Sequence, residues 1–246
     1  MASGGADFCL TSVNHYLRAR AQSGELPARF VSVVVRRSPM AGLVAASSHY
    51  ATKDHLAGTR VGGDTDNSMV KEYAAALSFL GLDPPVPVPM DYAAAPSALA
   101  SGEIDAVADF ADLVPRVRRQ SGIPVRAVPF GLPFYSSGLV AADRVPTETV
   151  LRMQTAVAAA LGRQRQDPRT GLDELAHRYP EADPVDAVEG WLLAEPNIFT
   201  DDGPVGTSEP ERWRATIAYA AGVHALPSPR PETVYRPEVI GLSAVH

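Results

Sequence analysis

Short apolar runs separated by polar turns occupy the chain up to Pro146, and helical periodicity dominates the remainder. The valine-rich run from Phe30 to Arg36 is the clearest strand, because β-branched side chains favour extended backbone. The same pattern of short apolar runs predicts further strands over 6–11, 42–46, 60–63, 104–108, 125–129 and 135–142.

Helical spacing is clearest from Asn67 to Gly81, where Val70, Tyr73 and Leu77 fall on one face and the glycine ends the helix. We predict shorter helices over 13–21, 53–58, 97–102 and 114–120, and longer ones over 149–163, 170–178, 182–194 and 210–221. The proline-rich tail from Leu226 is expected to run over the surface. Strands that alternate with helices indicate an α/β fold built from parallel βαβ units, followed by a helical C-terminal third.

Length and charge narrow the class of protein. A chain of 246 residues forms one large domain or two small ones. No apolar run approaches the roughly 18 residues of a membrane span, so none is expected. The net charge of −6 argues against a nucleic-acid partner. The single cysteine, Cys9, rules out an internal disulfide and a cysteine-cluster metal site, and its place in a predicted strand suggests a core residue. We expect no metal and no cofactor.

Candidate ligand groups follow the predicted strands, because ligands of open α/β sheets bind beyond the carboxyl ends of strands. Polar and aromatic residues gather after three predicted strands and, at Tyr135, where the last predicted strand begins, and this mixture suits a small-molecule site. The predicted ligand-binding residues are Ser12, Asn14, His15, Asp64, Thr65, Asp66, Asn67, Ser68, Asp109, Phe110, Asp112 and Tyr135.

Structural roles compete with ligand binding at each place. The stretch from Asp64 to Ser68 is equally suited to capping the helix that follows it. Asn14 and His15 could cap a helix or lie on the surface. For Asp109 and Asp112, a cap or a hydrogen bond to a ligand amine is favoured over general acid–base catalysis.

Five segments, in the same order, resemble one family of proteins. They are Gly5–Ser12, Lys53–Gly62, Ala100–Val107, Tyr135–Ala142 and Pro210–Trp213. They are similar to the substrate-binding proteins of ABC importers for sulfonates, taurine and thiamine pyrimidine precursors, the SsuA and thiamine-pyrimidine-synthase-like branch of the type II periplasmic binding fold.

The resemblance implies two α/β lobes with the ligand held in a hinged cleft between them. Residues 1–50 and 135–246 would form the first lobe, and residues 51–134 would form the inserted second lobe. Family members carry a further N-terminal segment that supplies strands to the first lobe, so this lobe is expected to be incomplete. A signal peptide or lipoprotein anchor would belong to such a segment, whereas the chain as it stands would be cytoplasmic.

Two kinds of function follow from the resemblance. In the first, the chain is a solute-binding protein that works with an ABC permease and performs no chemistry. Its acidic residues favour a thiamine pyrimidine precursor over a sulfonate or a nitrate-like solute, since an anion would prefer arginine. In the second, it is a cytosolic biosynthetic enzyme of the thiamine pyrimidine or menaquinone type. A truncated remnant that binds nothing is a further alternative.

Overall fold

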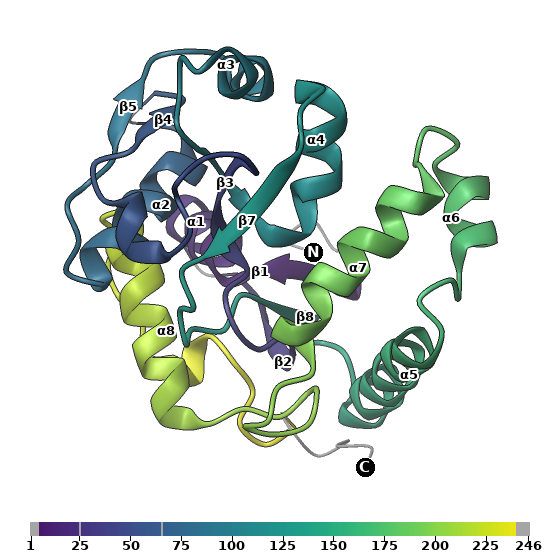
Figure 1. The fold of residues 1–246 in the computed structure, drawn as a ribbon. Helices are drawn as coiled ribbons and strands as arrows, with labels where there is room; N and C mark the ends of the chain where they lie inside the picture. Colours follow the sequence, from purple (N-terminus) through teal and green to yellow (C-terminus); the bar gives the residue numbers. More distant parts are fainter. Residues whose placement is uncertain (1–4, 25, 65, 240–246) are drawn as a thin grey trace. The chain divides into compact units, whose positions relative to one another are not determined.

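The computed structural model describes residues 5–24, 26–64 and 66–239 (Figure 1). Its described part divides into two compact units, which are considered separately. Unit 1 consists of residues 1–38, 133–170 and 195–246, and unit 2 consists of residues 39–132 and 171–194. Thr65, one of the predicted ligand residues, lies outside the described residues.

The described part of unit 1 contains an antiparallel sheet in the order β1-β8-β2, with helices around it. Its strands are β1 (Phe8–Ser12), β2 (Ala28–Val35) and β8 (Ser137–Ala142), and its helices are α1 (Val13–Ser23), α5 (Thr147–Gln166), α8 (Pro210–Val223) and the short turn η4 (Pro231–Thr233). Phe30, Trp213 and Tyr235 form the centre of its aromatic core, in which the last two rings stack 5.1 Å apart.

Unit 2 contains an antiparallel sheet in the order β6-β3-β7 and a parallel pair, β4-β5. Its strands are β3 (Met40–Ala45), β4 (Arg60–Gly62), β5 (Val86–Val88), β6 (Val107–Phe110) and β7 (Val125–Pro129). Its helices are α2 (Ser68–Phe79), α3 (Ala95–Ser101), α4 (Val114–Ser121) and α6 (Leu172–Arg178), with the short turns η1 (Lys53–Leu56), η2 (Tyr92–Ala94) and η3 (Ala111–Leu113). Helix α7 (Pro184–Ile198) begins in unit 2 and ends in unit 1.

The α/β class predicted from the sequence is confirmed, but the predicted strand direction is wrong for both three-stranded sheets. Parallel pairing is found between β4 and β5 and at two isolated bridges, from Val61 to Ala106 and from Phe30 to Tyr235. The strands in these sheets pair with partners far away in the sequence, such as β2 with β8. The local alternation of strands and helices does not encode such pairings.

Two further expectations need correction. Cys9 is exposed, because β1 is an edge strand among the described residues and turns Leu10 outward with 63% of its surface accessible. The tail does not simply run over the surface. Val234 and Val239 are fully buried, and Phe30 exchanges backbone hydrogen bonds with Val234 and Arg236.

The boundaries of the units differ from those expected for the lobes. Strand β3 pairs with β6 and β7 and therefore belongs with unit 2, so the division falls after Ser38 and after Leu132. Residues 171–194 also belong to unit 2, where ion pairs attach α7 to α4. None of the described helices is long and apolar enough to cross a membrane.

A buried arginine organises the loop that precedes α8 in unit 1. Arg36 is 1% exposed, and its guanidinium donates to Thr200, Asp202, Pro204 and Thr207. Burial opposes ionisation of Asp202, but hydrogen bonds from Thr200 and Arg212 outweigh it and hold the pKa of Asp202 well below its usual range. These hydrogen bonds and ion pairs hold residues 200–207 against Arg36, and we call this segment the clasp.

Candidate functional site

The N-terminus of α1 carries the first predicted cluster, in unit 1. Ser12 ends β1 and caps the helix, since its Oγ accepts a hydrogen bond from the His15 amide at 3.1 Å. The Oδ1 atom of Asn14 is buried and has no hydrogen-bond partner among the described residues. A buried acceptor without a donor is costly unless a water or ligand satisfies it, so Asn14 is the strongest ligand candidate of this cluster. The side chain of His15 is exposed.

Tyr135 lies next to this cluster in the same unit, since the Val13 amide donates to the Ser136 carbonyl at 2.9 Å. Its ring belongs to the buried core, where it meets Trp213 at 5.3 Å and the guanidinium of Arg212 at 4.4 Å. Its hydroxyl accepts a hydrogen bond from the Glu209 amide at 2.9 Å. These contacts account for Tyr135 structurally, and binding by this residue stays a prediction.

The loop between β4 and α2 carries the second cluster, in unit 2. Asn67 caps α2, because its Oδ1 accepts from the Met69 amide at 2.8 Å, as the capping alternative predicted. Asp66 is almost fully exposed and pairs with Lys71 at 3.1 Å. Asp64 is exposed and Ser68 is half-buried.

The end of β6 carries the third cluster. Asp109 is 6% exposed, and it accepts hydrogen bonds from the Tyr92 hydroxyl and, at 2.8 Å, from the Phe110 amide. Burial raises the pKa of Asp109 above its ordinary value. Burial also raises the pKa of half-buried Asp112, and the nearby charge of Asp109 adds to that rise. A nearby cation or N–H donors would stabilise the charged form of these two carboxyl groups, which burial disfavours.

The second and third clusters share one edge of unit 2. A parallel bridge joins Val61 of β4 to Ala106, the residue that directly precedes β6. Asp64 lies three residues after Val61, and Asp109 lies three residues after Ala106, so both lie toward the carboxyl ends of the two segments. We call this set the acidic edge: Asp64, Asp66, Asp109 and Asp112.

Two residues at the acidic edge were not identified from the sequence. Tyr92 lies in η2 and reaches Asp109 from a segment without helical or strand periodicity. Gly190 of α7 approaches the Asp112 carbonyl so closely that a Cβ atom there would lie 2.9 Å from the oxygen. Both contacts join segments that are separated in the sequence, and no local pattern predicts them.

A separate pocket of about 440 Å³ lies in unit 2, lined by residues of α3 and by Ala45, Ser47, Ile123 and Pro124. It is at the Ala45 end of β3, whereas Asp109 and Phe110 pair with the opposite end, at Ala41 and Met40. The predicted ligand residues are not among those that line it.

Comparison with solved structures defines the class of fold. The sulfonate-binding protein SsuA from Escherichia coli superimposes with a TM-score of 0.71 at 17% identity, covering 96% of this chain and 77% of that one. SsuA from Xanthomonas axonopodis pv. citri, bound to MOPS, gives a TM-score of 0.64 at 18% identity, with 95% and 82% covered. A putative SsuA from Methylobacillus flagellatus gives 0.66 at 15%, with 97% and 74% covered. The fold is therefore that of the type II periplasmic binding proteins.

The family follows from the sequence itself. The model of the NMT1/THI5-like family matches residues 1–170, and the chain belongs to this family. No curated protein sequence matches the chain. The resemblance carried by the five segments of the sequence is thus confirmed at the level of family and fold.

Proposed function

We propose that this chain is the solute-binding component of an ABC-type importer and captures a small polar molecule. The observation that carries the proposal is the family match over residues 1–170, and the fold shared with sulfonate-binding proteins supports it. In this role the chain performs no chemistry. Binding shifts its conformational equilibrium, and a permease recognises the liganded state.

The acidic edge decides which ligand class we favour. Carboxylates accept hydrogen bonds and attract cations, and they repel anions at short range. In unit 2, Arg60 binds Asp105, and Arg118 and Arg119 bind acids of α7. The charge of Arg116 partly offsets the rise in the pKa of Asp109, but it is one positive charge against the four carboxyl groups of the acidic edge. A sulfonate or nitrate-like solute would require free arginines. An amine-bearing heterocycle of the thiamine pyrimidine precursor type is therefore the proposed ligand.

We assign roles to the predicted residues on the same chemistry. Asp109 and Asp112 accept hydrogen bonds from ligand amino groups, and Asp64 contributes negative potential. In unit 1, Asn14 is proposed as a ligand acceptor through its unpartnered Oδ1. The remaining predicted residues stay proposed as ligand contacts of their own units: Ser12, His15 and Tyr135 in unit 1, and Asp66, Asn67, Ser68 and Phe110 in unit 2.

Isothermal titration calorimetry on the purified chain tests this function. An aminopyrimidine thiamine precursor, an alkanesulfonate such as MOPS and sodium nitrate are titrated separately. We expect saturable heat with the aminopyrimidine, and we expect the recovered ligand to be chemically unchanged. Binding of the sulfonate alone would retain the solute-binding role but contradict the ligand class. Conversion of the ligand would overturn the role itself.

A further inference from the structure

Residues 171–194 are attached to unit 2 although the chain on both sides of them belongs to unit 1. The chain therefore passes between the units four times, whereas a single inserted domain requires two passages. The last of these passages lies within α7, and Pro196 follows it inside the same helix. Because proline has no backbone N–H, the helix lacks one hydrogen bond at this residue.

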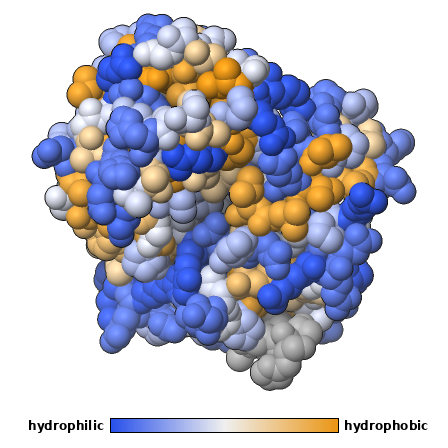
Figure 2. Space-filling model, viewed as in Figure 1, coloured by the Kyte–Doolittle hydropathy of each residue, from blue (hydrophilic) through white to orange (hydrophobic). Residues whose placement is uncertain are grey.

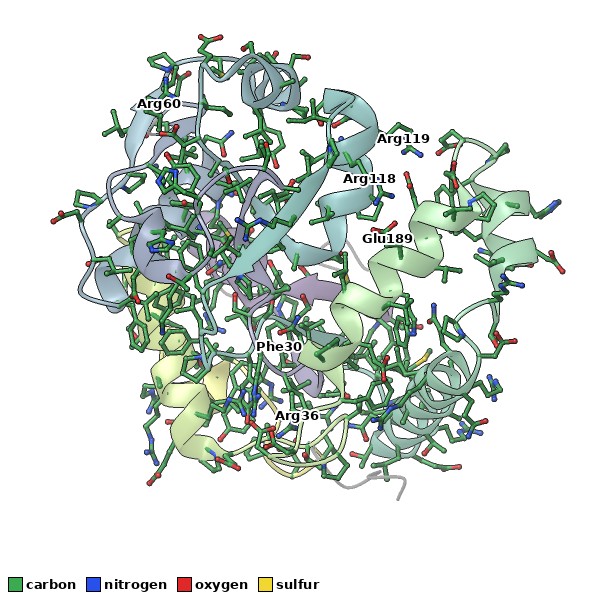
Figure 3. All side chains as sticks on the ribbon, in the orientation of Figure 1. Phe30, Arg36, Arg60, Arg118, Arg119 and Glu189 are labelled. Carbon is green, nitrogen blue, oxygen red and sulfur yellow. The ribbon has the colours of Figure 1, made fainter. Side chains whose placement is uncertain are left out.

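One face of α7 is fastened to α4 by charge (Figure 3). Arg118 forms a bidentate pair with Glu189, at 2.8 and 2.6 Å. Arg119 pairs with Asp186, and Asp183 lies 3.8 Å from the same guanidinium. The arginines occupy the last turn of α4, where the helix dipole favours cations, and Asp186 occupies the first turn of α7, where it favours anions.

A stripe of α7 beside the ion-paired face is open to solvent. Val185 is 69% exposed and Leu192 is 50% exposed. Figure 2 shows apolar side chains gathered over α7 in this view. Leu193, on the attached side, packs with the core of unit 2. The segment is therefore held by its ion pairs together with apolar burial, since Trp191 is only 9% exposed.

The attached face also touches the acidic edge. Gly190 lies one residue after Glu189, and its backbone packs directly on the carbonyl of Asp112. Any shift of α7 relative to α4 would change the space around that carbonyl, since close-packed contacts transmit small displacements. Glycine is required at this position because a Cβ atom would clash with backbone, which cannot move aside as a side chain can.

We propose that residues 171–194 form a salt-sensitive strap, which Arg118 and Arg119 fasten to unit 2 and which positions Asp112 through Gly190. Gly190 is a positioning residue and makes no contact with the ligand itself. The importance of Asp112 for binding rests on the proposed function, whereas the strap is a property of the unliganded chain. Screening of the ion pairs by salt loosens the attachment of the strap.

Hydrogen–deuterium exchange of the unliganded full chain tests this proposal. Because the pairs are partly exposed, we expect Arg118→Ala to speed exchange about threefold to tenfold in peptides covering 184–194 and 109–113. Arg214→Ala is the matched control, since Arg214 is an exposed arginine that pairs with Glu211 in unit 1. It should leave both regions unchanged.

A second pair of variants tests the contact with Asp112. Gly190→Ala should speed exchange at 109–113, whereas Gly222→Ala, with open space around its Cβ position, should not. Should Arg118→Ala fail to fold, the native chain is measured between low and high sodium chloride, and both regions should exchange faster as salt rises. Faster exchange in 184–194 without any change at 109–113 would overturn the proposal, as would no response in either region. No ligand is present, so these outcomes are independent of the proposed function.

Discussion

The hydroxyl group of Tyr92 donates a hydrogen bond to the buried carboxyl of Asp109, joining η2 to the end of β6. The carboxyl is desolvated, and Tyr92 is the one described side chain that donates to it. This contact fixes the direction of the most buried acid at the acidic edge. Its removal should therefore reduce stability.

Replacing Tyr92 with phenylalanine should lower the free energy of unfolding by about 1–3 kcal/mol, because a buried acceptor loses its donor. Urea denaturation followed by circular dichroism measures the change. Tyr179→Phe is the control, since Tyr179 is 56% exposed. It should change the free energy of unfolding by less than about 0.5 kcal/mol. Equal effects of the two substitutions would contradict the role given to Tyr92.

Asp109 should also shape the dependence of stability on pH. Its pKa is raised in the folded state, so between the ordinary aspartate pKa of about 4 and the raised value the folded state binds more protons. The contribution of Asp109 to stability is therefore complete below about pH 4 and is lost as pH rises through the folded pKa. Asp112 acts in the same direction.

The free energy of unfolding of Asp109→Asn should fall less steeply than that of the native chain as pH rises above 4. Urea unfolding at several pH values measures this slope. Asp83→Asn removes the same charge at an exposed position of unit 2 and should leave the slope unchanged. A slope that is identical in the native chain and in Asp109→Asn would show that Asp109 titrates normally.

The neighbouring arginines 36 and 37 should differ sharply in their effect on stability. Arg36 is buried and satisfies several acceptors of the 200–207 loop, so Arg36→Met should cost about 3–5 kcal/mol, because Asp202 loses a buried partner. Arg37 is 43% exposed and pairs with exposed Asp201, so Arg37→Met should cost less than about 1 kcal/mol. Thermal and urea unfolding of both variants compare them directly. Similar losses would contradict the clasp.

Glycine substitutions distinguish a tight strand contact from an open helix position. A Cβ atom at Gly138 would lie 2.2 Å from the Ser32 carbonyl oxygen, so Gly138→Ala should destabilise the chain by about 1–3 kcal/mol. Gly162 lies within α5 with open space around it, and Gly162→Ala should stabilise the chain by about 0.5–1 kcal/mol. The melting temperature should thus move in opposite directions. A rise for Gly138→Ala would contradict the register of β2 and β8.

Local features of the fold were predictable from the sequence, and long-range ones were not. The valine-rich strand and the Asn67 cap follow from residue types at neighbouring positions, and both are found. Pairing of β2 with β8 and the attachment of α7 to α4 join residues far apart in the chain, and no local pattern specifies them. Tyr135 was predicted from its place before a strand, but side-chain direction decides its surroundings, and its ring lies in the core of unit 1.

The most direct test of the central claim is a calorimetric titration of the aminopyrimidine into the native chain, Asp109→Asn and Asp83→Asn under identical conditions. Loss of a hydrogen bond between a carboxylate and an amino group should weaken binding by Asp109→Asn about tenfold or more. Asp83→Asn should bind as the native chain does. Equal affinity of all three proteins, or binding of a sulfonate that Asp109→Asn leaves unchanged, would contradict the assignment of the acidic edge as the ligand site.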